Sequence, residues 1–252
     1  APAAGEKVVV STDVLKLTFD TEGGSLVKSE FIQHDDLTEK DKPFILLDQS
    51  PNRFYVAQTG LIGGAFPTHK TPMTFTGERA LKDGANELAL RFESPDLGGV
   101  KLVKTWTLKR GSYDMTVRHE IVNTGTAPVS PQLYLQLVRD GNKPPGESSF
   151  YSTFTGPAVY TEAKKFQKIE FKDIENNKAD FVKESTNGYV AMVQHYFASA
   201  WLLKDGIPRD LFARKVDTNL YAVGMIAPVC AVAPGTTQAV DTTFFAGPQE
   251  EK

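Results

Sequence analysis

The sequence predicts an all-β protein. Roughly fifteen to eighteen short extended segments alternate with turns that contain Gly, Pro or Asn, at spacings of about 8–15 residues. Little of the chain keeps the 3.6-residue hydrophobic period of an amphipathic helix. With 252 residues, of which 40% are hydrophobic, the chain can bury a large core. These observations favour a large sandwich or barrel with few short helices.

The individual strands follow from the alternation of apolar and polar residues. In the first clear strand, Leu15, Leu17 and Phe19 alternate with polar side chains. The clearest unit is a β-hairpin over 100–122, in which an Arg-Gly-Ser turn joins two alternating strands. Further strands are expected at 25–32, 44–47, 86–93, 129–138, 211–216, 220–226 and 237–245, with loops at 34–42 and 139–149 and an ambiguous segment at 53–64.

Three further stretches have a distinct distribution of charged and apolar residues. Residues 187–202, NGYVAMVQHYFASAWL, carry no charge after the Asn-Gly turn, and predict a buried strand or strand pair near the middle of a sheet. Residues 160–175 place lysines among apolar residues and are expected to form a long strand with a charged face. The uncharged stretch 218–240 holds two glycines and two prolines, which indicate two short strands and a turn, not a membrane span.

No long or compositionally biased linker interrupts the interior, so one domain is expected over 8–252, with a tail or linker end at 1–7. The chain opens APAAGEK, without a signal peptide, and we expect a domain excised from a longer protein. The net charge of −3 argues against nucleic-acid binding. The single cysteine, Cys230, excludes an internal disulfide and is expected to be a small buried hydrophobe.

Motifs that carry chemistry are missing from the sequence. There is no HExxH, no GxSxG and no phosphate-binding glycine loop, so no catalytic residue, metal ligand or cofactor site is predicted. His119 and His195 lie on apolar stretches, where a structural role is the commoner explanation, and His34 and His69 lie in loops. The strongest positive patch is Lys164, Lys165 and Lys168. A solvated strand face explains it best, and contact with an acidic partner or lipid headgroups is the alternative.

Six stretches, in order along the chain, carry a family resemblance. The two most specific are FTGPAVYTEAKKFQKIEFKDI at 154–174 and GYVAMVQHYFASAWL at 188–202; the others lie at 8–26, 43–63, 104–117 and 242–249. They resemble the large periplasmic domain of the YidC family of bacterial membrane protein insertases. Tyr189 stands where the family pattern has Trp, an exchange that keeps a large aromatic ring.

The resemblance implies a β-supersandwich of the galactose mutarotase-like type, on the periplasmic side of the inner membrane. It also implies the Sec translocon and its subunit SecF as partners, with nascent inner-membrane proteins as further contacts. The region that contacts SecF in this family corresponds to 150–202 here. Within it we expect partner binding by Lys164, Lys165, Lys168, Tyr160 and Phe166. The domain itself is expected to be a monomer.

Two hypotheses from different classes result. The first is a non-enzymatic interaction domain of an insertase, which fits the resemblance and the missing catalytic motifs. The second is a carbohydrate-binding or mutarotase-like domain, in which His119 and His195 act with a carboxylate as acid and base in a cleft. The second requires the two imidazoles to lie close together.

Overall fold

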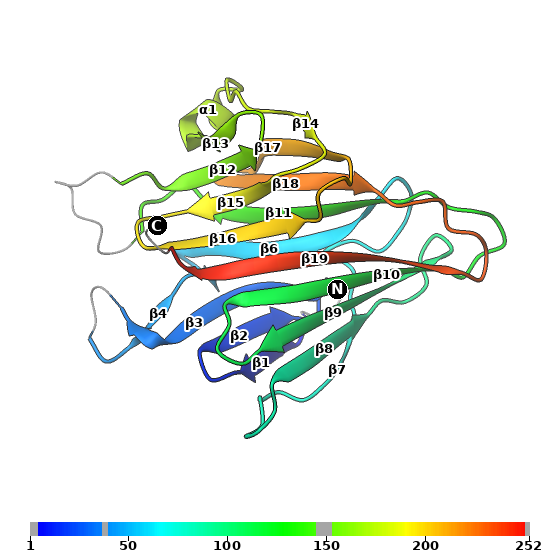
Figure 1. Ribbon diagram of the computed structural model, residues 1–252, viewed down its shortest axis with the longest axis horizontal. Coiled ribbons are helices and arrows are strands. Elements are labelled where there is room, and N and C mark those ends of the chain that lie inside the picture. The colour runs from blue at the N-terminus through cyan, green and yellow to red at the C-terminus, as the bar shows by residue number, and fades with distance from the viewer. Residues whose placement is uncertain (1–4, 37–39, 145–152, 250–252) are drawn as a thin grey trace.

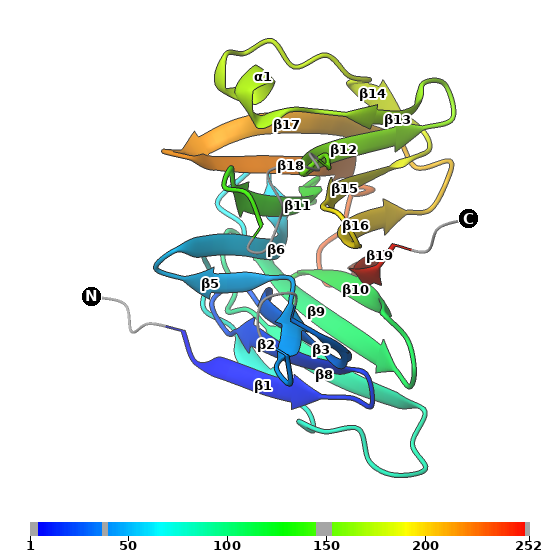
Figure 2. The same cartoon turned by 90° about the vertical axis from the view of Figure 1, so that its left-hand side faces the viewer.

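The computed structural model describes residues 5–36, 40–144 and 153–249. In these residues the chain forms nineteen strands and one short helix, arranged as two antiparallel sheets that pack face to face (Figure 1). The all-β sandwich prediction is confirmed. In Figure 1 the nine-stranded sheet lies in front and runs from β13 at the top to β7 at the bottom, and Figure 2 shows the two sheets side by side.

The ten-stranded sheet has the strand order β1-β2-β3-β6-β11-β18-β17-β14, with β4 paired to β3 and β5 paired to β6. Its strands are β1 (Lys7–Ser11), β2 (Leu15–Asp20), β3 (Ser25–Asp35), β4 (Pro43–Ile45), β5 (Asp48–Ser50), β6 (Arg53–Ile62), β11 (Gln132–Asp140), β14 (Glu184–Ser185), β17 (Arg209–Asp217) and β18 (Leu220–Pro228).

The nine-stranded sheet has the order β13-β12-β15-β16-β19-β10-β9-β8-β7. Its strands are β7 (Thr74–Thr76), β8 (Glu87–Glu93), β9 (Val100–Lys109), β10 (Asp114–Asn123), β12 (Gly156–Thr161), β13 (Lys165–Lys168), β15 (Tyr189–Val193), β16 (Phe197–Leu203) and β19 (Thr237–Pro248). The helix α1 (Phe171–Glu175) follows β13.

The core fills the space between the sheets, because alternate residues of each strand point inward. Trp106 and Trp201 are its largest side chains, and each is at most 1% exposed. Both indole N–H groups cross to the other sheet: Trp201 Nε1 donates to the Gln136 carbonyl at 3.0 Å, and Trp106 Nε1 to the Gly24 carbonyl at 3.3 Å. The two sheets are therefore joined by directional contacts as well as by apolar burial.

The predicted hairpin at 100–122 is confirmed as β9 and β10, which pair from Asn123↔Val100 to Met115↔Leu108. The ambiguous segment at 53–64 contains β6, a ten-residue strand. The stretch 218–240 contains β18 and the start of β19, as predicted. No helix in the described residues is long and apolar enough to cross a bilayer. Residues 37–39 of the first expected loop and 145–149 of the second lie outside the described residues.

Three predictions need correction. Residues 160–175 are not one long strand: β12 ends at Thr161, β13 pairs back against it, and α1 follows. Lys165, the first residue of β13, has φ +57°, a left-handed conformation that interrupts a continuous extended run through the turn. Cys230 is exposed rather than buried, between the buried residues Val229 and Val232. Lys7, placed in the tail by the sequence, begins β1 and pairs with Asp20 at 2.5 Å.

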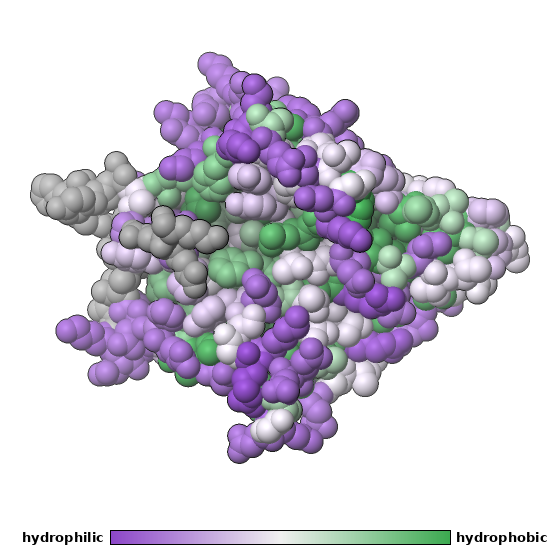
Figure 3. Space-filling view, viewed as in Figure 1, coloured by the Kyte–Doolittle hydropathy of each residue, from purple (hydrophilic) through white to green (hydrophobic). Residues whose placement is uncertain are grey.

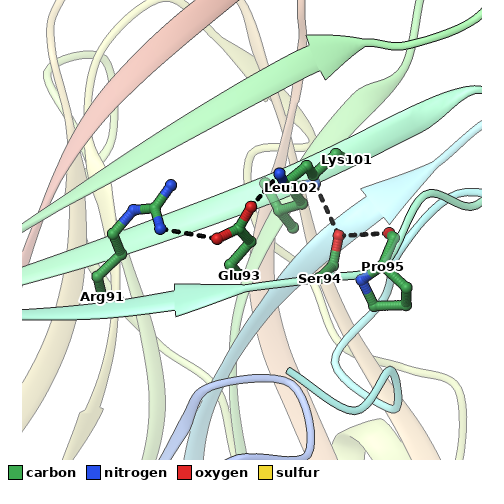
Figure 4. Close-up of polar contacts among 6 residues, drawn as sticks. All are labelled: Arg91, Glu93, Ser94, Pro95, Lys101 and Leu102. Atoms are coloured by element: carbon green, nitrogen blue, oxygen red, sulfur yellow. Dashed lines mark hydrogen bonds and ion pairs between the residues drawn. The ribbon is translucent and has the colours of Figure 1, made fainter. Parts of the chain in front are cut away.

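Polar side chains fix the end of the β8–β9 hairpin (Figure 4). Ser94 Oγ accepts the Leu102 backbone N–H at 2.8 Å and donates to the Pro95 carbonyl at 2.9 Å. Glu93 pairs with Lys101 and with Arg91, and these contacts, that with Lys101 first, lower the pKa of its carboxyl. Such exposed pairs contribute little stability, so Ser94 has the larger part in closing this turn.

Candidate functional site

The charge-free stretch at 187–202 forms the strand pair β15–β16, close to the middle of the nine-stranded sheet. Val190, Met192 and Trp201 point inward and belong to the main core. The alternate residues, among them Ala191 and Ala200, form a second apolar cluster on the outer face of the sheet. The run is therefore apolar on both faces, a pattern typical of a strand that is covered on both sides.

An apolar hollow of about 390 Å³ lies on this outer face. Strand register explains its shape. Ala191 of β15 pairs with Ala200 of β16, and Ala200 pairs with Phe245 of β19. This row across the strands therefore consists of two small side chains followed by an aromatic ring. The neighbouring row contains Tyr189 and Leu202, which rise above the alanines. Figure 3 shows hydrophobic and neutral side chains over β15 and β16, with hydrophilic ones above and below.

Aromatic rings surround the hollow. Tyr160 stacks on Tyr189, with ring centroids 5.1 Å apart, and Phe166 pairs with Tyr160 across β12 and β13. Phe166 lines the hollow and is 42% exposed. Tyr196, in the turn between β15 and β16, is 53% exposed; it does not line the hollow itself, but its carbonyl accepts the N–H of Gln249, which does. These two are the only large aromatic side chains that are exposed in the described residues.

The predicted basic patch lies next to the hollow. We call β12, β13 and the turn between them the basic hairpin, which contains Lys164, Lys165 and Lys168. All three lysines are exposed, and none forms an ion pair with any residue that the structure describes. Lys168 Nζ lies 5.5 Å from the centre of the Phe154 ring. Because β13 is an edge strand, lysines here also hinder sheet-to-sheet aggregation, which is a structural reason for their presence.

The five residues predicted for partner binding are thus brought together at one end of the nine-stranded sheet. Phe166 lines the hollow, Tyr160 stacks on the lining residue Tyr189, and the lysines belong to the same hairpin as Phe166 and Tyr160. Sequence reasoning missed the floor residues Ala191 and Ala200 and the ring of Phe245. The available signal was the unbroken apolar run itself, which gives both faces of the strand pair an apolar surface.

The structure does not bring His119 and His195 together. His119 is fully buried on β10 opposite Val240 of β19, and its Nε2 lies 2.9 Å from Thr59 Oγ1. His195 is exposed, in the turn before β16, where Phe197 pairs with Pro248. Positions 240 and 248 are separated by about 26 Å along β19, at 3.3 Å per residue. These two residues therefore cannot share a catalytic cleft.

A second, polar cleft lies on the outer face of the ten-stranded sheet and has a volume of about 630 Å³. His69 is the histidine that lines it, and its Nδ1 lies 2.5 Å from Tyr134 Oη. Burial, together with the positive charges of Lys104, Lys70 and Arg214, lowers the pKa of His69 to about 4. The imidazole is therefore neutral at physiological pH. Among the described residues there is no cluster of three metal-ligating side chains.

The sandwich belongs to the galactose mutarotase-like architecture. A galactose mutarotase related enzyme from Lactobacillus acidophilus superposes with a TM-score of 0.58 at 8% identity, over 96% of this chain and 97% of that chain. A putative aldose 1-epimerase from Escherichia coli gives a TM-score of 0.53 at 11% identity, over 97% and 99%. At such low identities the likeness shows the fold alone.

The particular family follows from the sequence. The sequence model of the family described as the YidC periplasmic domain matches residues 7–252, and the chain belongs to this family. Proteins described as membrane protein insertase YidC are 48% identical in Janthinobacterium sp. (strain Marseille) and 49% identical in Burkholderia cenocepacia (strain HI2424). Both matches cover 100% of this chain but only 44% and 46% of those proteins, so the chain spans less than half their length.

Proposed function

We propose that this chain is a non-enzymatic docking domain of a membrane protein insertase, on the periplasmic side of the inner membrane. Its partners in this proposal are the Sec translocon, through the periplasmic part of SecF, and nascent inner-membrane proteins as weaker contacts. Family membership supports the insertase context. The observation that carries the docking role is the apolar outer face of β15 and β16, with its aromatic border and the basic hairpin beside it.

The composition of this surface suits protein recognition. Exposed aromatic side chains around a small apolar floor are typical of the anchoring points of interfaces, and a charged rim steers association. Phe166 at the hollow and Tyr196, next to the lining residue Gln249, provide the exposed rings, and Lys164, Lys165 and Lys168 the positive charge. Acidic side chains on the partner, around an apolar segment that enters the hollow, would complement it. In this proposal the domain is a monomer that binds its partner one to one.

Calorimetric titration of the domain with the periplasmic domain of its cognate SecF tests the proposal. We expect saturable binding that weakens about tenfold in Phe166→Ser, the loss typical of an exposed aromatic anchor. Reversal of the three hairpin lysines to Glu should slow association and remove most of its salt dependence.

The matched control reverses three exposed lysines elsewhere, Lys16, Lys40 and Lys109, to Glu. It changes the net charge by the same amount and should leave affinity within about twofold at physiological salt, because screening limits charge effects to about 8 Å. Equal weakening by both triple variants would reduce the effect to net charge and contradict a local site. No binding by the unaltered domain would overturn the docking role.

A further inference from the structure

The polar cleft lies on the face of the ten-stranded sheet that is turned away from the docking surface. Leu135, Leu137 and Ala57 belong to the main core, so their alternating neighbours on β6 and β11 face outward. Gln58 pairs with Gln136, and Val56 with Val138, which places an amide row next to an apolar row. These four side chains line the cleft. Their strands β6 and β11 lie between β3 on one side and β18 and β17 on the other, a strand order that can be followed in Figure 2.

The apolar row is part of a defined patch. Val27, Val56 and Val138 form a small buried cluster of their own, against which Phe54 packs. All four side chains line the cleft. Gly224, opposite Gln136 on β18, has no side chain, and the ring of Phe212 packs over it. The valines and Phe54 therefore offer a strip of CH groups with one ring, next to hydrogen-bonding groups.

Beside its charged groups, the polar cleft contains neutral donors and acceptors, which include Gln58, Gln136 and His69. Gln136 is 4% exposed, and its Nε2 donates to Gln58 Oε1 at 2.9 Å. The Tyr134 hydroxyl accepts the His69 backbone N–H at 2.9 Å and can donate its own proton to Nδ1, which places the single N–H of the neutral imidazole on Nε2. Amides and a neutral imidazole both donate and accept, as sugar hydroxyls do.

Ser25 supplies an independent observation. It lines the cleft and is 4% exposed, yet its Oγ has no hydrogen-bond partner in the structure. A buried hydroxyl without a partner is destabilising, and few are found in folded proteins. Because the Oγ itself has almost no accessible surface, a rotation of the Ser25 side chain toward the cleft would let a ligand hydroxyl satisfy it.

The charges at the edge of the cleft balance. Three acidic residues, Asp20, Glu22 and Asp217, and three basic residues, Lys70, Arg214 and Lys215, line it. Two of the six are already paired, Asp20 with Lys7 and Lys215 with Glu175. A site with no excess charge favours a neutral ligand over an anion or a cation.

We propose that the polar cleft binds a neutral saccharide, with the valine strip and Phe54 against its CH face and Ser25, Gln58, Gln136 and His69 on its hydroxyls. This site is separate from the docking surface, and neither proposal depends on the other. The cleft volume of about 630 Å³ is sufficient for one or a few sugar units.

Titration of the ¹⁵N-labelled chain with galactose, glucose, N-acetylglucosamine and maltotriose tests this proposal. At least one of these sugars should give saturable amide shifts centred on β6 and β11, with an affinity that changes little with salt. Ser25→Ala should weaken that binding about fivefold to tenfold, the loss of one hydrogen bond, while the thermal midpoint stays equal or rises.

Thr155→Val is the matched control, because Thr155 Oγ1 is also a buried hydroxyl without a partner but does not line the cleft. It should leave sugar binding unchanged. An absence of saturable shifts with every sugar in the panel would overturn the proposal. So would unchanged binding in Ser25→Ala, or shifts of β6 and β11 by an unstructured peptide but by none of the sugars.

Discussion

Two basic side chains lie next to each other in the core. Lys104 and His119 are paired across β9 and β10, and both are 0% exposed. Lys104 Nζ donates to the carbonyls of Gly23 and Thr59 at 2.5 and 2.6 Å, and so connects the two sheets. Burial lowers the pKa of Lys104 to about 7, and burial together with the charge of Lys104 lowers that of His119 to about 3.

This pair makes stability depend on pH in a predictable direction. In the unfolded chain His119 is protonated below about pH 6.5, whereas the folded protein keeps it neutral down to about pH 3. The unfolded state then binds more protons, so the free energy of unfolding falls as pH falls through this window, by about 1.4 kcal/mol per pH unit. Lys104 acts in the same direction between about pH 10.5 and 7.

We therefore predict that His119→Gln reduces the loss of stability on acidification. Urea unfolding of both proteins at pH 6.5, 5.5 and 4.5 measures the effect as the difference between the two slopes, about 1.4 kcal/mol per unit. The control is His34→Gln, which removes a partly exposed histidine of β3. Parallel slopes for wild type and His119→Gln would contradict a neutral buried imidazole.

The exposure of Cys230 gives a second prediction for a single residue. Cys230 is exposed in the native fold, so one thiol per chain should react with Ellman's reagent without denaturant. Cys230→Ser should abolish the signal. A thiol that reacts only after urea is added would contradict the structure of the 228–234 segment.

Burial of Cys230 was predicted from its apolar neighbours in PVCAVAP. The segment joins β18 to β19 without forming a regular strand; Val229 N–H donates to the Pro131 carbonyl, and Val129 and Val232 form an isolated bridge. The valines point inward and the cysteine does not. Composition alone does not contain this information.

At the scale of elements, one arginine holds the loops on either side of the β15–β16 hairpin. Arg209, at the start of β17, is 2% exposed. Its guanidinium donates hydrogen bonds of 2.6–3.2 Å to the carbonyls of Thr186, Gly188, Leu203, Lys204 and Ile207. A planar five-donor group suits this ring of carbonyls, and the three donors of a lysine do not.

Arg209→Lys is therefore expected to destabilise the fold by about 3 kcal/mol, because several buried carbonyls lose their donor. The free energy of unfolding in urea measures it. Arg79→Lys, at an exposed arginine paired with Glu6, should change stability by less than about 0.5 kcal/mol. Similar small losses for both variants would show that the loops hold without this contact.

Sequence patterns predicted most elements because alternation is a local property. The hairpin at 100–122 and the strand pair at 187–202 needed nothing else. The prediction of one long strand over residues 160–175 was wrong because the fold of this segment depends on groups that are distant in sequence. Val182 N–H donates to Gln167 Oε1, and Tyr221 Oη donates to Glu175 at the end of α1. The hollow also depends on pairing partners, since Phe245 lies 45 positions from Ala200 in sequence and next to it in the sheet.

At the scale of the whole molecule, each sheet has one outer face with a distinct chemical character. The outer face of the nine-stranded sheet carries the apolar hollow and the basic hairpin, and that of the ten-stranded sheet carries the polar cleft. The fold is that of galactose mutarotase-like proteins, but the histidines first considered for catalysis are separated along β19. We therefore propose partner docking for one face and ligand binding for the other.

The most direct test of the docking role is amide-shift mapping of the ¹⁵N-labelled domain during titration with the periplasmic domain of its cognate SecF. We predict that the perturbed amides cluster on β12, β13, β15 and β16, around Phe166 and Ala200, and that those of β6 and β11 remain unchanged. Perturbations confined to the polar cleft, or none at saturating SecF, would contradict it.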